Sequence, residues 1–176
     1  MAIPSRQIGW GTEENLLWQI SKQIDYLTKV AYNASNIQVP SNNIVIANLP
    51  NDQTIVPNGD TLVNFTSITD PNGWFINDGS LFQPTIAGYY NISCSVLWQT
   101  AIGGNQLNTQ INKNGTIQVY INQSQLNIND NYSQSGSVIV YLNGTTDYII
   151  VTVFTSNDVD QIIQGGNGTL FNASLI

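Results

Sequence analysis

The stretch that decides the fold is DPNGWFINDGSLFQPTIAGYYNISCSVLW, residues 70–98. In its second half, apolar residues occupy every other position, namely Tyr90, Ile92, Cys94, Val96 and Trp98. Because successive side chains of a strand point to opposite faces, this alternation predicts a long strand with one buried face. Cys94 is the only cysteine, so no disulfide can form within the chain, and we expect a buried core thiol there.

Apolar or alternating runs continue on both sides of this stretch. The predicted strands are residues 44–49, 61–68, 88–98, 116–122, 137–142, 148–155 and 169–176. The turn signals between them are Asn58-Gly59-Asp60, Pro71-Asn72-Gly73, Asn114-Gly115, Asn143-Gly144 and Gly165-Gly166-Asn167-Gly168. Many short strands with no helix between them predict a mainly β protein, a sandwich or barrel, and residues 51–176 suit one jelly roll.

The N-terminal part has a different pattern. Residues 1–11 carry a proline, two glycines and no helical period, so we expect an extended arm. Residues 12–32 are predicted to be a helix, because Thr12 is a good N-cap and acidic residues follow it in the first turn. Lys29 is expected near the helix end, where positive charge is favourable. Residues 33–50 are then expected to hold a polar linker and the first strand.

The predicted helix carries an apolar seam with steps of three and four residues. We call this set the seam, and its members are Leu17, Ile20, Ile24, Leu27 and Ala31. The seam packs either on the chain's own domain or on copies of itself, and we favour self-association because the arm and the linker detach the helix. About two heptads are marginal in water, so another part of the protein must contribute most of the assembly.

Charge excludes two classes of partner. The net charge is −7, and the basic residues are Arg6, Lys22, Lys29 and Lys113. Binding to a phosphate backbone needs clustered Lys and Arg, so we expect no nucleic-acid partner. The same balance argues against an anionic membrane surface, and we expect neither a membrane span nor a secretory leader.

The sequence has few residues that are suited to catalysis. The chain has no histidine, which excludes Ser-His-Asp and Cys-His catalysis. Glycoside hydrolysis needs paired carboxylates, but Glu13 and Glu14 are explained as residues of the helix start. Most of the aspartates lie in turn signals, where they cap backbone amides: Asp60, Asp70, Asp78, Asp130, Asp147, Asp158 and Asp160. We therefore expect no catalytic residues and no enzyme activity.

Metal binding has weak candidates. Asp158 and Asp160 in NDVD, and Asp130 in NDN, offer oxygen ligands of the kind that calcium prefers. Neither run matches an EF-hand loop, and turn chemistry explains both. We expect no cofactor, with calcium at Asp158 and Asp160 as the alternative.

The aromatic spacing carries a resemblance to a known family. The positions that carry it are Asp70, Phe75, Phe82, Gly88 and Tyr90. Their spacing resembles the signature of the complement-globular-head and tumour-necrosis-factor jelly-roll family. The closing TLFNASLI, with Phe171, resembles that family's ending, with Ala173 where the family has glycine. Departures are Asn64, Ile92 and Cys94, where the signature has aromatic residues.

This resemblance implies a compact homotrimer packed around a threefold axis, which would supply the assembly that the seam cannot provide alone. The family also includes calcium-binding trimers. The residues have physical reasons of their own, because Phe75 and Phe82 can fill the centre of a sandwich. Gly88 is expected to permit a turn into the long strand.

The N-terminal run SRQIGWGTEENLLWQISKQIDYLTKV, residues 5–30, resembles something different. It is similar to a leader shared by small virion structural proteins of tailed bacteriophages and some other large DNA viruses. Within it, Arg6, Ile8 and Trp10 are the candidates for docking to the virion. The alternative is that Trp10 packs on the start of the helix bundle.

Together these patterns predict a homotrimeric head or tail fibre, or a capsid decoration protein, made in the host cytoplasm and located on the virion surface. Its arm would bind capsid or tail proteins. Its jelly roll would bind a host-surface glycan or receptor, or only decorate the particle. The alternatives are a soluble complement-like or cytokine-like trimeric binding module and, less favoured, a carbohydrate-active enzyme.

Overall fold

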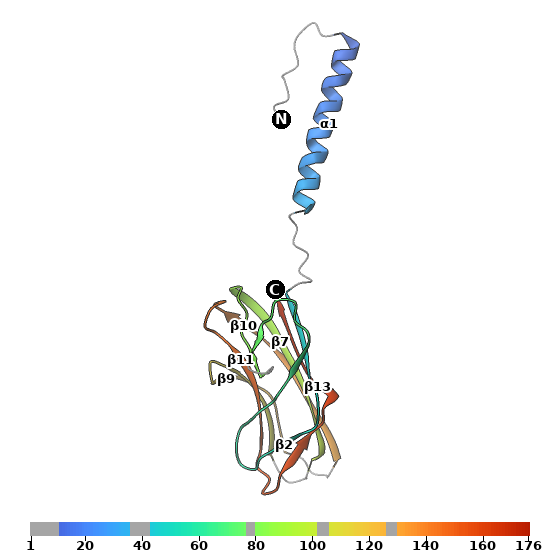
Figure 1. Ribbon diagram of the computed structural model, residues 1–176. Helices are drawn as coiled ribbons and strands as arrows, with labels where there is room; N and C mark the ends of the chain where they lie inside the picture. The colour runs from blue at the N-terminus through green and yellow to red at the C-terminus, as the bar shows by residue number, and fades with distance from the viewer. Residues whose placement is uncertain (1–10, 36–42, 77–79, 102–105, 126–129) are drawn as a thin grey trace. The chain divides into compact units, whose positions relative to one another are not determined.

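The computed structural model describes residues 11–35, 43–76, 80–101, 106–125 and 130–176. The chain divides into two compact units, residues 1–39 and residues 40–176. In the described residues, the first unit holds one helix and the second holds thirteen strands (Figure 1). The expected arm, apart from Gly11, lies outside the described residues, as does most of the expected linker.

Helix α1 spans Thr12–Ser35, three residues beyond the predicted end. No glycine or proline interrupts its last turn, so nothing in the sequence stops the helix at residue 32. The amide of Asn15 donates to the carbonyl of Gly11 at 3.2 Å, so Gly11 occupies the N-cap position expected for Thr12. Lys29 lies before the last turn, contrary to expectation, and pairs with Asp25 at 3.0 Å. Among the described residues, no helix is long and apolar enough to cross a membrane.

The second unit is a sandwich of two antiparallel sheets. Sheet A has the order β2-β12-β7-β13-β1-β4, with β10 also paired to β7. Sheet B has the order β5-β6-β11-β8-β9, with β3 also paired to β11. Figure 1 shows β7 and β13 in one layer and β9 and β11 in the other. The strands are β1 (Ile44–Leu49), β2 (Gln53–Ile55), β3 (Thr61–Leu62), β4 (Thr66–Thr69), β5 (Phe75–Ile76), β6 (Leu81–Phe82), β7 (Gly88–Ala101), β8 (Gln106–Lys113), β9 (Thr116–Gln125), β10 (Asp130–Leu142), β11 (Ile149–Thr155), β12 (Gln161–Ile163) and β13 (Gly166–Leu175).

The observed strand pairing corrects two predicted boundaries. Strand β1 pairs with β13 and β4, so the jelly roll includes residues 44–49 rather than beginning at residue 51. The single strand predicted over 61–68 is two short strands, β3 and β4, which belong to different sheets. Between them Val63 and Phe65 are both buried, and this part of the chain crosses from one sheet to the other.

The long predicted strand forms the centre of sheet A. Strand β7 pairs with β10 on one side and with β13 on the other. Its alternating face is buried from Tyr90 to Trp98, and Cys94 is 3% exposed. Burial raises the pKa of the Cys94 thiol to about 12, so the thiol is neutral near pH 7. The expected buried core thiol is therefore confirmed.

The core between the sheets is aromatic. The ring of Phe82 lies 5.7 Å from that of Tyr90 and 5.8 Å from that of Phe171. Phe75 contacts Phe171 edge to face at 5.2 Å. Asp70 fixes the start of this segment, because its two carboxylate oxygens accept hydrogen bonds from the amides of residues 74 and 75, each at 2.9 Å.

Gly88 has a different role from the expected one. Its φ is not in the left-handed region, so no unusual turn requires a glycine there. Instead, a Cβ at this position would lie 2.5 Å from Cδ1 of Leu175 on β13. Gly88 therefore allows the side chain of Leu175 to cover the start of β7.

Candidate functional site

Strand β8 presents a row of four amide side chains on the face of sheet B that points away from the core. We call these the amide row, and its members are Gln106, Asn108, Gln110 and Asn112. Leu107 and Ile111, which alternate with the amides along β8, belong to the core. The amide side chains therefore point to the opposite face of sheet B. Asn108, Gln110 and Asn112 are only 3–6% exposed, although they lie on the outer face. Neighbouring side chains therefore hold them in place.

Aromatic rings flank the amide row from both adjacent strands. Phe154 of β11 lies opposite Asn108. Tyr120 of β9 lies opposite Gln110 and is 48% exposed. The row thus has an aromatic ring on each side, and one of the rings is open to solvent.

Two irregularities in the pairing of β9 with β8 place Tyr120 there. The register steps from Asn122 opposite Thr109 to Tyr120 opposite Gln110, so Ile121 is an extra residue. A second shift follows between Ile111 and the last member of the amide row. A one-residue change of register reverses which face a side chain occupies, so the first bulge brings Tyr120 to the face of the amides.

Hydrogen bonds hold both ends of the amide row. Nε2 of Gln106 donates to Oδ1 of Asn108 at 3.0 Å. Nδ2 of Asn112 donates to Oγ1 of Thr152 at 2.8 Å, while its buried Oδ1 has no hydrogen-bond partner. These bonds limit the rotamers that the end amides can adopt.

Gln110 is held less tightly than the two end amides. Nε2 of Gln110 donates to Oδ1 of Asp60 at 3.3 Å, and Oε1 of Gln110 accepts from Oγ1 of Thr152 at 3.4 Å. The first distance exceeds the usual 2.7–3.2 Å of an N–H···O hydrogen bond, and the second exceeds the usual 2.5–3.0 Å of an O–H···O hydrogen bond. Gln110 can therefore exchange these contacts for shorter ones with a ligand.

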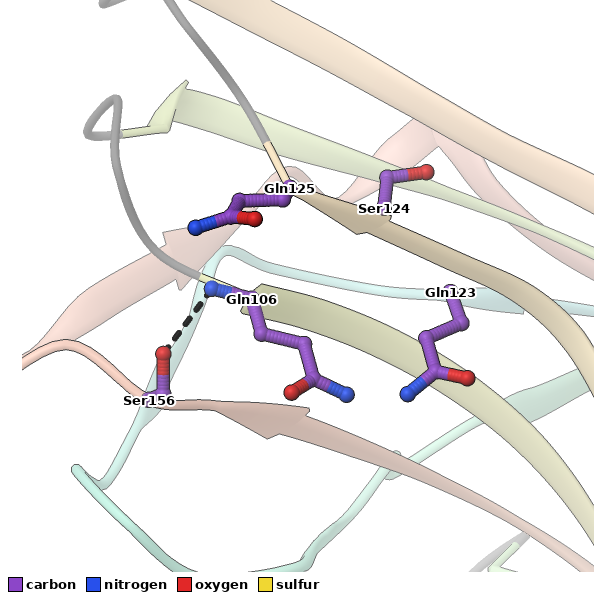
Figure 2. Close-up of a pocket in the computed structure, with 5 residues that line it drawn as sticks. All are labelled: Gln106, Gln123, Ser124, Gln125 and Ser156. Atoms are coloured by element: carbon purple, nitrogen blue, oxygen red, sulfur yellow. Dashed lines mark hydrogen bonds between the residues drawn. The ribbon is translucent and has the colours of Figure 1, made fainter.

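Two open pockets adjoin this surface. The first, of about 400 Å³, is lined by Asp60, Ile117, Tyr120, Phe154 and three members of the amide row. The second, of about 360 Å³, is lined by Gln123, Ser124, Gln125, Ser156 and Gln106 (Figure 2). Gln106 lines both pockets, and its backbone amide donates to Oγ of Ser156 at 2.8 Å. Amide groups thus continue from one pocket into the next.

This surface was not expected, because the sequence patterns predicted no strand over residues 106–113. A signal was present, since amides at 106, 108, 110 and 112 alternate with Leu107, Thr109 and Ile111. The bulges that turn Tyr120 toward the amides have no comparable signature in the sequence.

The residues proposed for assembly lie on α1. Leu17, Ile20, Ile24 and Leu27 are 42–64% exposed. Ala31 lies in the same helix, and its side chain falls outside the described set. The docking candidates Arg6, Ile8 and Trp10 lie outside the described residues.

The fold-signature residues lie away from both pockets. Asp70 caps backbone amides, Gly88 begins β7, and the aromatic members Phe75, Phe82, Tyr90 and Phe171 pack in or against the core. The two metal candidates lie in an exposed turn, where Oδ1 of Asp158 accepts from Nδ2 of Asn58 at 3.5 Å and Asp160 is exposed. In the described part of the chain, no three His, Cys, Asp or Glu residues gather to hold a metal.

The carboxylate of Asp147 accepts hydrogen bonds from several neighbouring groups. A hydrogen bond from Lys113 at 2.8 Å lowers the pKa of Asp147, and further bonds from the side chain of Asn114 and the backbone of Asn143 lower it again. Burial of the carboxylate opposes these effects. The cluster joins the turn after β8 to the turn before β11, so it stabilises the fold and borders neither pocket.

No family model matches the chain, and no curated protein matches it. Among solved structures, murine APRIL at pH 8.0 superposes with a TM-score of 0.55 and 13% identity, over 76% of this chain and 98% of that one. The PRD1 vertex protein P5 superposes with a TM-score of 0.52 and 12% identity, over 77% and 97%. These identities show the fold alone. The expected mainly β, tumour-necrosis-factor-like jelly-roll sandwich is thereby confirmed.

Proposed function

We propose that the chain is a non-enzymatic, homotrimeric structural protein of a virus particle. It is a head or tail fibre or a capsid decoration protein of a tailed bacteriophage or another large DNA virus. The N-terminal arm with Arg6, Ile8 and Trp10 binds capsid or tail proteins, and helix α1 joins three copies. The jelly roll is displayed on the virion surface, after synthesis in the host cytoplasm, and contacts a host-surface glycan or receptor.

The observation that carries this proposal is the exposed apolar seam of α1. Leu17, Ile20, Ile24 and Leu27 are each at least 42% exposed in the single chain. A helix with an apolar stripe gains stability when that stripe is buried against other helices. The helix belongs to a different compact unit from the jelly roll, which favours copies of itself as the partner.

A second apolar surface supports self-association of the jelly roll. The rings of Tyr89 on β7 and Tyr141 on β10 contact each other at 5.4 Å and are 59% and 47% exposed. Ile139 beside them is also exposed. Because two heptads are marginal in water, this surface gives a second set of contacts through which the copies associate.

The leader resemblance supports the virion part of the proposal. Residues 5–30 combine a tryptophan-containing arm with the start of an amphipathic helix. PRD1 vertex protein P5 has the same fold as the jelly roll, so this architecture suits a protein of a virus particle. A trimer also presents three copies of any surface site, which raises avidity by about 10²–10⁴ without new contacts.

Association with particles tests the proposal. Tagged full-length chain is mixed with purified particles of the source virus that lack it, and the particles are sedimented. The full chain should sediment with the particles, while deletion of residues 1–10, which keeps Gly11 at the start of α1, or Trp10→Ala should leave it in the supernatant. Trp18→Ala is the matched control, because it removes a tryptophan from the helix rather than from the arm. Equal sedimentation of all four proteins would reject the docking role.

The alternative is a soluble complement-like or cytokine-like trimeric binding module. It shares the trimer and the jelly roll but needs no contact between the arm and a particle. Failure of the full chain to sediment with particles, together with a trimeric mass, would favour this alternative.

A further inference from the structure

We propose that the amide row and the rings beside it form a binding site for neutral carbohydrate. This inference rests on the proposed function, because it names the class of ligand that the displayed jelly roll binds. It assigns the binding to the outer face of sheet B and to the turn at residues 58–60 that borders it.

The chemistry of the amides suits sugar hydroxyls. A hydroxyl group both donates and accepts hydrogen bonds, and a side-chain amide offers both functions within one planar group. Asn108 and Gln110 supply two such groups on one face of β8, and Gln106 extends them into the second pocket. A row of amides can therefore bind adjacent hydroxyls of one sugar ring.

The amides are held in position before a ligand arrives. Asn108 and Gln110 are 6% and 3% exposed, so they lose little rotamer freedom on binding. Gln110 makes only long hydrogen bonds, at 3.3 and 3.4 Å, which a hydroxyl can replace with shorter ones. This combination of fixed position and weak existing bonds favours a polar, uncharged ligand.

The rings supply the apolar contact that sugars need. One face of a pyranose ring presents C–H groups, which pack on an aromatic ring. Tyr120 is 48% exposed beside Gln110, and Phe154 and Ile117 line the same pocket. A sugar ring bound to the amides therefore lies against Tyr120.

Charge decides between neutral and acidic sugars. Among the described residues that line the two pockets, Asp60 supplies the only carboxylate and none is a Lys or Arg. Lys113, at the end of β8, is already paired with Asp147 at 2.8 Å. Sialylated or sulfated ligands would place a negative charge near Asp60 without a compensating base, so neutral sugars are favoured.

The size of the surface fits more than one sugar ring. Pockets of about 400 and 360 Å³ share Gln106, and both lie within the usual range of about 300–1,000 Å³ for small-molecule sites. We therefore expect an oligosaccharide to bind more tightly than its monosaccharide.

The test begins with the full chain on a printed array that carries neutral oligosaccharides of glucose, galactose, mannose and N-acetylhexosamines beside sialylated and sulfated ones. The strongest neutral compound is then titrated by calorimetry. Tyr120→Ala should weaken binding at least about tenfold, and Gln110→Ala should weaken it by a similar factor. Asp60→Ala, at an exposed position, should also weaken binding and tests the site if Gln110→Ala fails to fold. Tyr26→Ala on α1 is the matched control, since it removes an exposed tyrosine from the other unit.

Unchanged affinity of Tyr120→Ala would overturn this inference. So would binding restricted to acidic glycans, binding of a protein receptor at this surface instead, or no binding to any neutral compound. These outcomes are separate from failure of the proposed function. A trimer that sediments with particles but binds no sugar rejects only this inference, whereas a monomer that binds sugar through Tyr120 rejects only the trimeric virion role.

Discussion

The indole Nε1 of Trp98 donates a hydrogen bond to Oε1 of Gln134 at 3.0 Å, with both side chains completely buried. The same Oε1 accepts from Oγ1 of Thr109 at 2.6 Å, and Nε2 of Gln134 donates to the carbonyl of Leu107 at 3.0 Å. Trp98 and Gln134 belong to sheet A, while the other two residues belong to β8 of sheet B. One buried glutamine therefore links the two sheets across the core.

Replacement of that glutamine should destabilise the fold strongly. Gln134→Leu keeps most of the volume but leaves buried polar groups of Trp98, Thr109 and Leu107 without a partner. Each buried unsatisfied group costs about 1–3 kcal/mol, so the free energy of unfolding should fall by about 3 kcal/mol or more. Chemical denaturation measures this loss. Ser135→Ala, at an exposed position on the same strand, should change little, and a loss below about 1 kcal/mol for Gln134→Leu would contradict the account.

Removal of the Asp70 carboxylate should loosen the segment that leads into the aromatic core. Asp70→Ala deletes both acceptors of the amides at residues 74 and 75, each bonded at 2.9 Å. Hydrogen bonds to a charged group contribute about 1.5–3 kcal/mol each, so the loss of both should lower the free energy of unfolding by about 3 kcal/mol or more. Asp70→Asn retains one acceptor oxygen and should lose less. Equal losses for the two variants in thermal or chemical melts would count against this role.

The architecture was predictable because its main signals are periodic. The alternation from Tyr90 to Trp98 predicted the buried face of β7. The turn signals predicted turns at the places where Asn58, Asn114 and Gly144 have a positive φ. Strand β8 was not predicted, because only two of its eight residues, Leu107 and Ile111, are apolar. Helix bounds were wrong by three residues because the sequence after residue 32 holds no stop signal.

Stability in acid should depend on Asp147. Hydrogen bonds from Lys113 and Asn114 hold the pKa of Asp147 below its ordinary value of 3.8 in the folded chain. A carboxyl whose pKa is lowered by folding stabilises the fold above its unfolded pKa, and this contribution is lost as the pH falls through the folded pKa. Urea melts between pH 6 and pH 2 should therefore show a decline that begins near pH 4. Asp147→Asn should remove part of that decline, and an identical slope would contradict the assignment.

Cys94 should be chemically inert in the folded chain. Burial raises the pKa of its thiol from 9.0 to about 12, and the side chain is 3% exposed. A chromogenic disulfide reagent at pH 8 should label it only after denaturation, because the thiolate is both scarce and covered. A group whose pKa is raised by folding stabilises the fold below its unfolded pKa. Its contribution is lost as the pH rises from about 9 toward the folded value, so unfolding should become easier in that range. Rapid labelling under native conditions would show that β7 opens.

The amide row and the rings beside it were harder to predict than the core. Its amides could be read from the alternation in residues 106–112, but its rings come from other strands. Tyr120 reaches the amides only through a bulge, and Phe154 does so through the register of β11. Such cross-strand positions depend on pairing between distant segments, which local patterns do not encode.

Sedimentation equilibrium of the full chain at micromolar concentration measures directly whether three copies associate. We expect three times the 19.3 kDa mass of one chain. The double variant Ile20→Asp with Ile24→Asp should weaken the assembly, because it places charges in the seam, while Tyr26→Ala outside the seam should leave it intact. A mass of 19.3 kDa for the unmodified chain would contradict the trimer, and with it the structural role proposed for the helix.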